Sequence, residues 1–324
     1  MRSDNSIMKR CPICQHSDLK QLLRLENLPV FCNVLSENKE EAVNCTYGVQ
    51  NLELCLHCGF VFNSEFEVQK LEYEEDYHAE RGSSAYYQEH MNKTVEIIEN
   101  ICSLSNKKIL EVGCGTGEFL KLLSERGTAL CIGVDPSASE ENAEKVRFYQ
   151  CLFDENFLND IPDNIDILIS RHMIEHISNP LEMLNLFSKS LPVGGLLYLE
   201  TPRLDWILEN KVFYDFPYEH CSYFSDEFMV RMLKAAGFEK LKIELSYSGQ
   251  YFSILAYKCE ELNCLLPMTS LTRNKIENQF LAITQFYSKA KEVLSSQEIW
   301  KQYIDIDTTL QLLKIVPLLL NQHF

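Results

Sequence analysis

Short apolar runs separated by glycine turns and helical patterns dominate the middle of the chain. KKILEVG from Lys107 is followed by GEFLKLLSERG, whose apolar residues have helical spacing, and then by ALCIGVD. Further strand patterns follow as VRFYQCLF, IDILIS and GGLLYLE, with the helical pattern PLEMLNLFSKSL between the last two. Such alternation of strand and helix is typical of a parallel sheet covered by helices. The pattern therefore predicts an α/β fold.

The pattern of apolar residues also predicts the elements that precede and follow these strands. Apolar residues at helical intervals indicate a helix before the first strand, namely Met91, Val95, Ile98 and Cys102. Another helix is expected to begin after Ser225, a favoured N-cap residue, and to end at Gly237. LKIELSYS and YFSILAYK follow, with only Gly249 and Gln250 between them, which predicts a hairpin at the sheet edge.

The N-terminal part has a different character, because six of the thirteen cysteines fall within its first 58 residues. Four of them form two CxxC pairs, Cys11 with Cys14 and Cys55 with Cys58. We therefore predict three parts: a cysteine module over 1–75, an α/β domain over 76–258 and a helical extension over 259–324.

Two CxxC pairs supply four thiolates, and four cysteine sulfurs at the corners of a tetrahedron form a common structural zinc site. The alternatives are two unrelated reduced pairs or a redox motif, and neither CxxC lies between a strand and a helix as a thioredoxin-like motif would. A site with four thiolates has no open coordination position. We therefore predict zinc at Cys11, Cys14, Cys55 and Cys58, with a role in folding.

Charge and hydropathy narrow the range of partners. The chain of 324 residues has 30 Lys and Arg against 47 Asp and Glu, a net charge of −17 that disfavours binding to a phosphate backbone. The N-terminus has no apolar signal core, and no segment has the apolar length of a membrane span. We expect a cytoplasmic protein with a small-molecule substrate and with neither nucleic acid nor membrane as partner.

A glycine turn connects the first strand of the α/β pattern to its first helix. The segment reads Glu111-Val112-Gly113-Cys114-Gly115-Thr116-Gly117, and Asp135 ends the next strand. A GxGxG turn alone also occurs in dinucleotide-binding folds. Together with Glu111 and an acidic residue after the second strand, it resembles motif I of the Rossmann-like class I S-adenosylmethionine (SAM) methyltransferases.

This resemblance implies a set of SAM-binding residues. The three glycines would line the cofactor pocket with Glu111, and Asp135 would accept hydrogen bonds from both ribose hydroxyls. Phe153 and Asp154, after the third strand, correspond to the place where such enzymes frame adenine, although Asp154 could instead cap a helix. Ser170 ends the fourth strand beside Arg171, which could serve either the substrate cleft or a structural ion pair.

The order of motifs over residues 11 to about 258 is more specific. CPxC and CxxCG, an acidic-aromatic link, motif I, HMIEHISNP and FYDFPYEHCSYFS together resemble the zinc-containing methyltransferases that act on nucleotide-linked deoxysugars. The resemblance implies that His220 is a general base oriented by Glu219. It places Tyr218, His176 and Tyr77 around the acceptor.

Alternative functions follow from the same residues. Sugar C-methyltransferases carry a second α/β domain, whereas only about 65 residues follow Lys258, so methylation of C, O or N is left open. A zinc-bearing ribosomal RNA methyltransferase would need a basic module, but residues 1–90 hold eight Lys and Arg against fifteen Asp and Glu. A SAM-binding protein without catalysis is the third reading.

Overall fold

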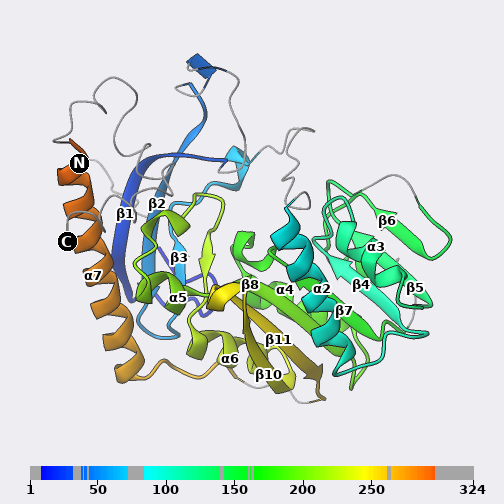
Figure 1. Ribbon diagram of the computed structural model, residues 1–324. Helices are drawn as coiled ribbons and strands as arrows, with labels where there is room; N and C mark the ends of the chain where they lie inside the picture. The colour runs from blue at the N-terminus through cyan, green and yellow to red at the C-terminus, as the bar shows by residue number, and fades with distance from the viewer. Residues whose placement is uncertain are drawn as a thin grey trace, which may run out of the picture. The chain divides into compact units, whose positions relative to one another are not determined.

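The computed structural model describes residues 9–31, 38, 40–41, 44–71, 84–138, 142–159, 161, 164–260 and 264–295 (Figure 1). The chain divides into two compact units, each made of segments that are separated in the sequence. Unit 1 comprises Met1–Tyr77, Leu204–Phe228 and Leu266–Phe324, and unit 2 comprises His78–Arg203 and Met229–Leu265.

Unit 2 contains a seven-stranded sheet in the order β10-β11-β8-β7-β4-β5-β6. The five strands from β8 to β6 run parallel, and β10 and β11 join antiparallel at one edge. Their bounds are β4 (Lys108–Val112), β5 (Leu130–Val134), β6 (Val146–Tyr149), β7 (Ile167–Arg171), β8 (Leu196–Pro202), β10 (Phe238–Ser246) and β11 (Tyr251–Lys258). The predicted α/β fold and its edge hairpin are therefore confirmed.

Helices α2 (Ala85–Glu99), α3 (Glu118–Ser124) and α4 (Pro180–Ser190) belong to unit 2, with the short helices η3 (Phe157–Asn159), η4 (Ile174–His176) and η6 (Tyr247–Gly249). The α2 face predicted to be apolar is buried at Met91, Val95 and Ile98. Helix α6 (Asp226–Ala235) begins in unit 1 and ends in unit 2. The Ser225 hydroxyl accepts a hydrogen bond from the Phe228 amide at 3.3 Å, which confirms the predicted cap.

Unit 1 contains a four-stranded antiparallel sheet in the order β1-β2-β3-β9. The strands are β1 (Leu19–Pro29), β2 (Tyr47–Cys55), β3 (Val61–Asn63) and β9 (Ser222–Tyr223). The helices described in this unit are η1 (Val68–Lys70), α5 (Leu204–Glu209), η5 (Phe213–Asp215) and α7 (Ser270–Ser295). Long-range pairing of β9 with β3 brings a segment from the middle of the chain into the sheet of the cysteine module.

The core of unit 1 explains why segment 204–228 lies there. Phe216 is fully buried and stacks on Phe280 of α7, with ring centroids 5.8 Å apart. Tyr223 of β9 packs edge-on against Phe216. We predicted this segment inside a domain over 76–258, whereas in the structure its aromatic side chains complete the core of unit 1.

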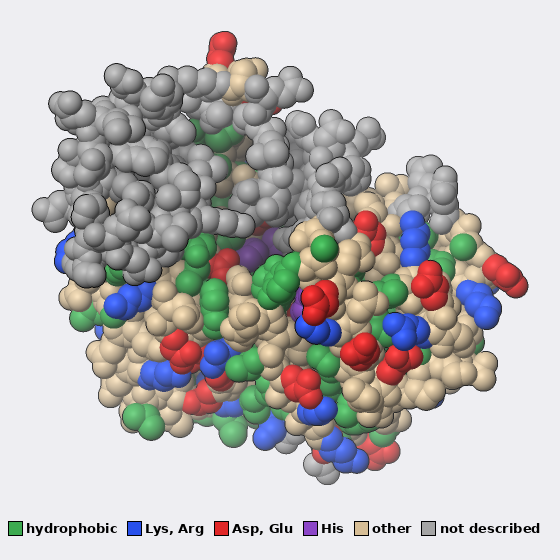
Figure 2. Space-filling model, in the orientation of Figure 1, with side chains coloured by type: hydrophobic (Ala, Val, Ile, Leu, Met, Phe, Trp, Pro, Cys, Tyr) green, Lys and Arg blue, Asp and Glu red, His purple; other side chains and the backbone are tan. Residues whose placement is uncertain are grey.

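Charged side chains of both signs are interspersed over the face shown in Figure 2. Several of them pair, for example Lys107 with Asp166 at 2.9 Å and Lys189 with Glu155 at 2.6 Å. Among the described residues, no helix combines the length and apolarity needed to cross a membrane.

Candidate functional site

The glycine turn follows β4 directly and precedes α3. Gly113, Gly115 and Gly117 all have positive φ, at 78°, 50° and 82°. A Cβ on Gly113 would lie 2.7 Å from Met173, and one on Gly117 would lie 2.3 Å from Phe148, so packing requires glycine at both positions. A Cβ on Gly115 would meet nothing within 4 Å. The backbone at Gly115 is therefore open to a ligand.

Asp135 lies beside this turn, at the end of β5 as predicted. Its Oδ2 accepts a hydrogen bond from the Gly115 amide at 3.1 Å. Its Oδ1 accepts bonds from the amide and hydroxyl of Ser137 at 2.8 and 2.6 Å. A carboxylate has about four lone-pair positions, so Asp135 keeps capacity for ligand hydroxyls. The turn and the acid thus form one structure at the carboxyl ends of two parallel strands, where α/β sheets bind ligands.

Two buried polar groups lie on the strands next to this turn. Glu111 of β4 and Ser170 of β7 are 2% and 0% exposed. Glu111 Oε2 and Ser170 Oγ have no hydrogen-bond partner within the described part of the chain. Burial raises the pKa of Glu111 to about 8, although the Arg171 charge opposes that shift. Unpartnered buried groups are rare in proteins, and both residues match the predicted cofactor set.

The two residues predicted at the adenine position have structural roles. Phe153 is buried, and its ring packs against Phe157 and Phe187 at centroid distances of 5.9 and 5.7 Å. Asp154 Oδ1 accepts hydrogen bonds from the amides of Asn156 and Phe157 at 2.9 and 3.0 Å, as a helix cap does. The ring of Phe153 therefore packs in the core, and its contact with adenine stays a prediction.

A buried charge network surrounds Glu200, at the end of β8. The Glu200 carboxylate lies 3.0 Å from His90 of α2, 3.0 Å from His172 after β7 and 3.4 Å from Arg171. The Tyr198 hydroxyl also donates to it at 3.0 Å. Two imidazoles and a carboxylate can bind a divalent metal. Because Arg171 already supplies a positive charge here, we interpret the cluster as an ion-pair network.

The electrostatics of this network follow from its burial. Burial disfavours every charge in it, yet Arg171 and the two histidines hold the pKa of Glu200 well below its usual value. Burial likewise opposes the charged form of His172, but Glu175 and Glu200 raise its pKa above 6.5. His172 also has a positive φ of 50°, an uncommon conformation for a residue other than glycine.

The network resolves one of our open alternatives and adds residues that we did not predict. Arg171 belongs to a structural ion pair, and its guanidinium lies 4.1 Å from the centre of the Phe119 ring. Glu200 and His90 were missed because their partners lie far away in the sequence. The available signal was a charged residue at the end of the apolar run GGLLYLE.

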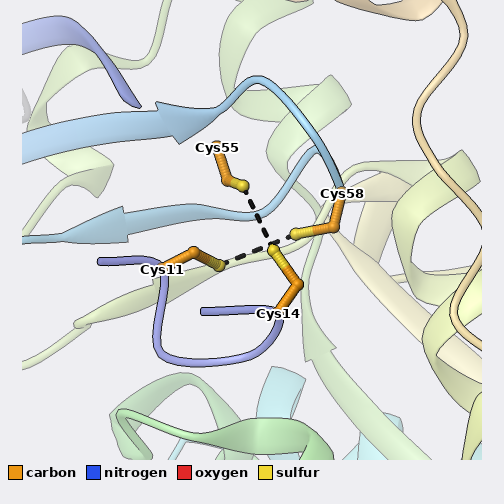
Figure 3. Close-up of side chains that lie close together, drawn as sticks. All are labelled: Cys11, Cys14, Cys55 and Cys58. Carbon is orange, nitrogen blue, oxygen red and sulfur yellow. Dashed lines mark hydrogen bonds between the residues drawn. The ribbon is translucent and has the colours of Figure 1, made fainter. Parts of the chain in front are cut away.

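The four cysteines of unit 1 converge in one cluster (Figure 3). Cys11 and Cys14 lie on the loop before β1, Cys55 ends β2, and Cys58 lies in the turn between β2 and β3. Their sulfurs all lie within 4.8 Å of one another, with Cys11 to Cys58 at 3.7 Å and Cys14 to Cys55 at 3.4 Å. A tetrahedral zinc ion with bonds of about 2.3 Å would separate its sulfurs by about 3.8 Å. Donor type and spacing therefore fit such an ion.

The residues predicted around the acceptor are distributed over the chain. Tyr218 and Glu219 are buried in unit 1, where His220 is partly exposed. His176 is partly exposed in η4 of unit 2, and Tyr77 lies outside the described residues.

Tyr218 packs within the core of unit 1. Its hydroxyl accepts a hydrogen bond from the Glu67 amide at 2.9 Å, and a Cβ on Gly48 would lie 2.2 Å from its ring. Tyr218 therefore packs in the core of unit 1, and its contact with the acceptor stays a prediction.

The sheet order, the glycine turn and Asp135 together define a Rossmann-like methyltransferase fold. Residues 86–243 match the family model described as a methyltransferase domain. This stretch of the chain therefore matches a methyltransferase domain in sequence as well as in fold.

The chain is also similar to several named proteins. The chain is 26% identical over 224 residues to a C-methyltransferase, NovU, of Streptomyces niveus, covering 66% of this chain and 52% of that protein. It is 26% identical over 186 residues to a ubiquinone biosynthesis O-methyltransferase of Idiomarina loihiensis, covering 51% of this chain and 75% of that protein. A SAM-dependent methyltransferase structure from Archaeoglobus fulgidus has 20% identity and a TM-score of 0.40, covering 54% of this chain and 100% of the other. The chain thus spans about half the length of NovU.

Proposed function

We propose that this protein transfers a methyl group from SAM to a small-molecule acceptor, and that the acceptor is a sugar or a nucleotide-linked sugar. The observation that carries the first part is the open backbone at Gly115 beside the carboxylate of Asp135. The sugar class is supported by the paired CxxC motifs together with the YEHCSYFS segment. The relatives are named as C- and O-methyltransferases, so carbon and oxygen are both candidates for the methylated atom.

The residues that would hold SAM are those of the glycine turn, with Glu111, Asp135 and Ser170. The bound cofactor supplies a methyl group on a positively charged sulfonium, which is a good leaving group. The protein therefore has two tasks, which are to orient the acceptor and to remove its proton. A buried acid such as Glu111 can offset the cofactor's positive charge.

For proton removal we propose His220 as general base, with Glu219 orienting its ring and His176 and Tyr77 shaping the acceptor pocket. An imidazole with a pKa near 6.5 has a suitable strength for this task at neutral pH. The proposal is supported by the resemblance of the YEHCSYFS segment and by the partial exposure of His220.

We further propose that the cysteine cluster binds one structural zinc ion. The support is the spacing of its four sulfurs, together with thiolate donors that suit zinc. All four positions of a tetrahedral ion would be filled by cysteine, so the ion would stabilise the fold of unit 1 and leave the chemistry to other residues.

The test of the function is an acceptor screen with the purified protein and SAM carrying a labelled methyl group. Label appearing in a nucleotide sugar or saccharide supports the proposal, and mass spectrometry of the product locates the methylated atom. Transfer only to RNA would contradict the acceptor class. The matched control is Gly115→Val, which should lose turnover with every acceptor because its side chain fills the open space at the turn.

A further inference from the structure

Gln50 connects the cysteine module to the segment that carries His220. It lies on β2 and is fully buried. Its Nε2 lies 3.0 Å from the Pro217 carbonyl oxygen and 3.0 Å from the His220 carbonyl oxygen, so one amide serves both ends of a short turn. The Tyr223 hydroxyl lies 2.6 Å from the same nitrogen. All of these residues belong to unit 1.

The orientation of the Gln50 amide is fixed by its other end. Gln50 Oε1 accepts a hydrogen bond from Asn63 Nδ2 at 2.6 Å. Asn63 Oδ1 in turn accepts from the amides of Asn51 and Glu65, both at 3.0 Å, so its own nitrogen must point toward Gln50. The Gln50 nitrogen is thereby directed at the turn, where its two hydrogens are shared among three acceptors.

The turn itself is held on both sides of Gln50. The His220 amide donates to the Pro217 carbonyl at 3.1 Å. β9 follows at once and pairs with β3, where Phe62 faces Ser222. Tyr218 packs on Gly48, two residues before Gln50 on the same strand. The backbone of Glu219 and His220 is therefore fixed by the sheet of the cysteine module.

We propose that Gln50 is a positioning residue for methyl transfer, because it fixes the backbone on which His220 is carried. This inference rests on the proposed role of His220 as the base. The position of a catalytic side chain matters steeply, since an error of about 1 Å can cost about 100-fold in rate. Loss of the Gln50 donors frees the His220 carbonyl, and the imidazole then samples several orientations.

The variant Gln50→Met removes both donors at nearly the same volume, and Gln50→Glu keeps the shape and the acceptor oxygen. We expect either change to lower kcat at least tenfold, while the affinity for SAM and the zinc content stay within twofold of wild type. In the wild-type enzyme we expect kcat to fall sharply as the pH drops through the imidazole pKa, and in the Gln50 variants this fall should become less sharp. The control is Ile283→Val, a mild change in the core of the same unit that should lower stability and leave kcat unchanged below the unfolding transition.

Each outcome decides between the two proposals. If His220→Ala is slow and a folded Gln50 variant has the wild-type kcat and pH profile, Gln50 is structural and the inference is wrong. If His220→Ala has the wild-type kcat, the assignment of the base is wrong and the positioning role is lost with it. Should Gln50→Met not fold, Gln50→Glu provides the same measurement, because Asn63 keeps its partner there.

Discussion

The amide of Gly115 donates a hydrogen bond to the carboxylate of Asp135 over 3.1 Å, and this contact joins the ends of two parallel strands. It fixes the open backbone of the glycine turn next to an acidic group. One carboxylate thus organises the turn and, in the proposed function, would also bind the cofactor ribose.

Asp135→Ala should weaken SAM binding by about 10- to 100-fold, because hydrogen bonds to a charged group contribute about 1.5–3 kcal/mol. Titration calorimetry measures the effect. Asp166→Ala is the matched control, since Asp166 precedes β7 and so lies at the other end of the parallel strands, where its loss should leave SAM affinity unchanged. Equal affinity in Asp135→Ala and wild type would refute the site.

SAM binding near pH 7 should release a proton from Glu111. Burial raises the pKa of that carboxyl to about 8, so the free protein holds it mostly protonated, and a positively charged cofactor lowers this pKa. Calorimetry in buffers of different ionisation enthalpy counts the released protons. Glu111→Gln should bind without proton release, and release that persists in this variant would assign the proton to another group.

His220→Ala should lower kcat by about 10²–10⁴-fold while SAM affinity is retained, because general base catalysis contributes rate increases of that size. In the wild-type enzyme the rate should fall as the pH drops through the imidazole pKa, since only the neutral ring accepts a proton. Rate profiles of both proteins on the same acceptor test this. An amine acceptor that arrives neutral would need no base, and His220→Ala would then keep its rate.

The purified protein should contain about one zinc ion for each chain, and Cys55→Ser should lose it. Removal of one thiolate opens the tetrahedron, so we expect unfolding of unit 1 in preference to a specific loss of turnover. Elemental analysis and thermal unfolding report the two effects. Cys114→Ser is the control, because Cys114 lies in unit 2, and the prediction is wrong if both variants carry equal zinc.

The Glu200 network should make stability depend on pH in two directions. The low pKa of Glu200 gives stability that is present above pH 4.5 and is lost as the pH falls through its folded pKa. The raised pKa of His172 gives stability that is present below pH 6.5 and is lost as the pH rises through its folded pKa. Urea unfolding should therefore show the largest contribution between pH 4.5 and 6.5.

The variant Glu200→Gln isolates this contribution. It should cost about 3–5 kcal/mol, the usual effect of breaking a buried pair, and should flatten the acid side of the profile. Glu155→Gln is the control, since Glu155 is an exposed partner of Lys189 and exposed pairs contribute little. Similar losses of unfolding free energy in both variants would show that the buried network stabilises the protein no more than an exposed ion pair does.

Local signals explain why the sheet of unit 2 could be predicted from sequence. The edge hairpin and the cap at Ser225 depend on near neighbours, and motif I has strand, turn and helix within a few residues. Phe153 and Tyr218 show the limit of local signals, because the packing of Phe153 on Phe187 and of Tyr218 on Gly48 joins residues that are far apart in the sequence. Pairing of β3 with β9 depends on residues that are about 160 positions apart and left no local pattern.

That pairing has a consequence for how the protein is made. During synthesis, β3 leaves the ribosome long before β9, so the sheet of unit 1 has an unprotected edge until Tyr223 has been added. The five parallel strands of unit 2, by contrast, all precede β9 in the sequence, so they can begin to assemble before that edge is covered. Slow elongation between these two strands would prolong the exposure, and synonymous codons in that stretch of the gene should therefore influence the yield of folded protein.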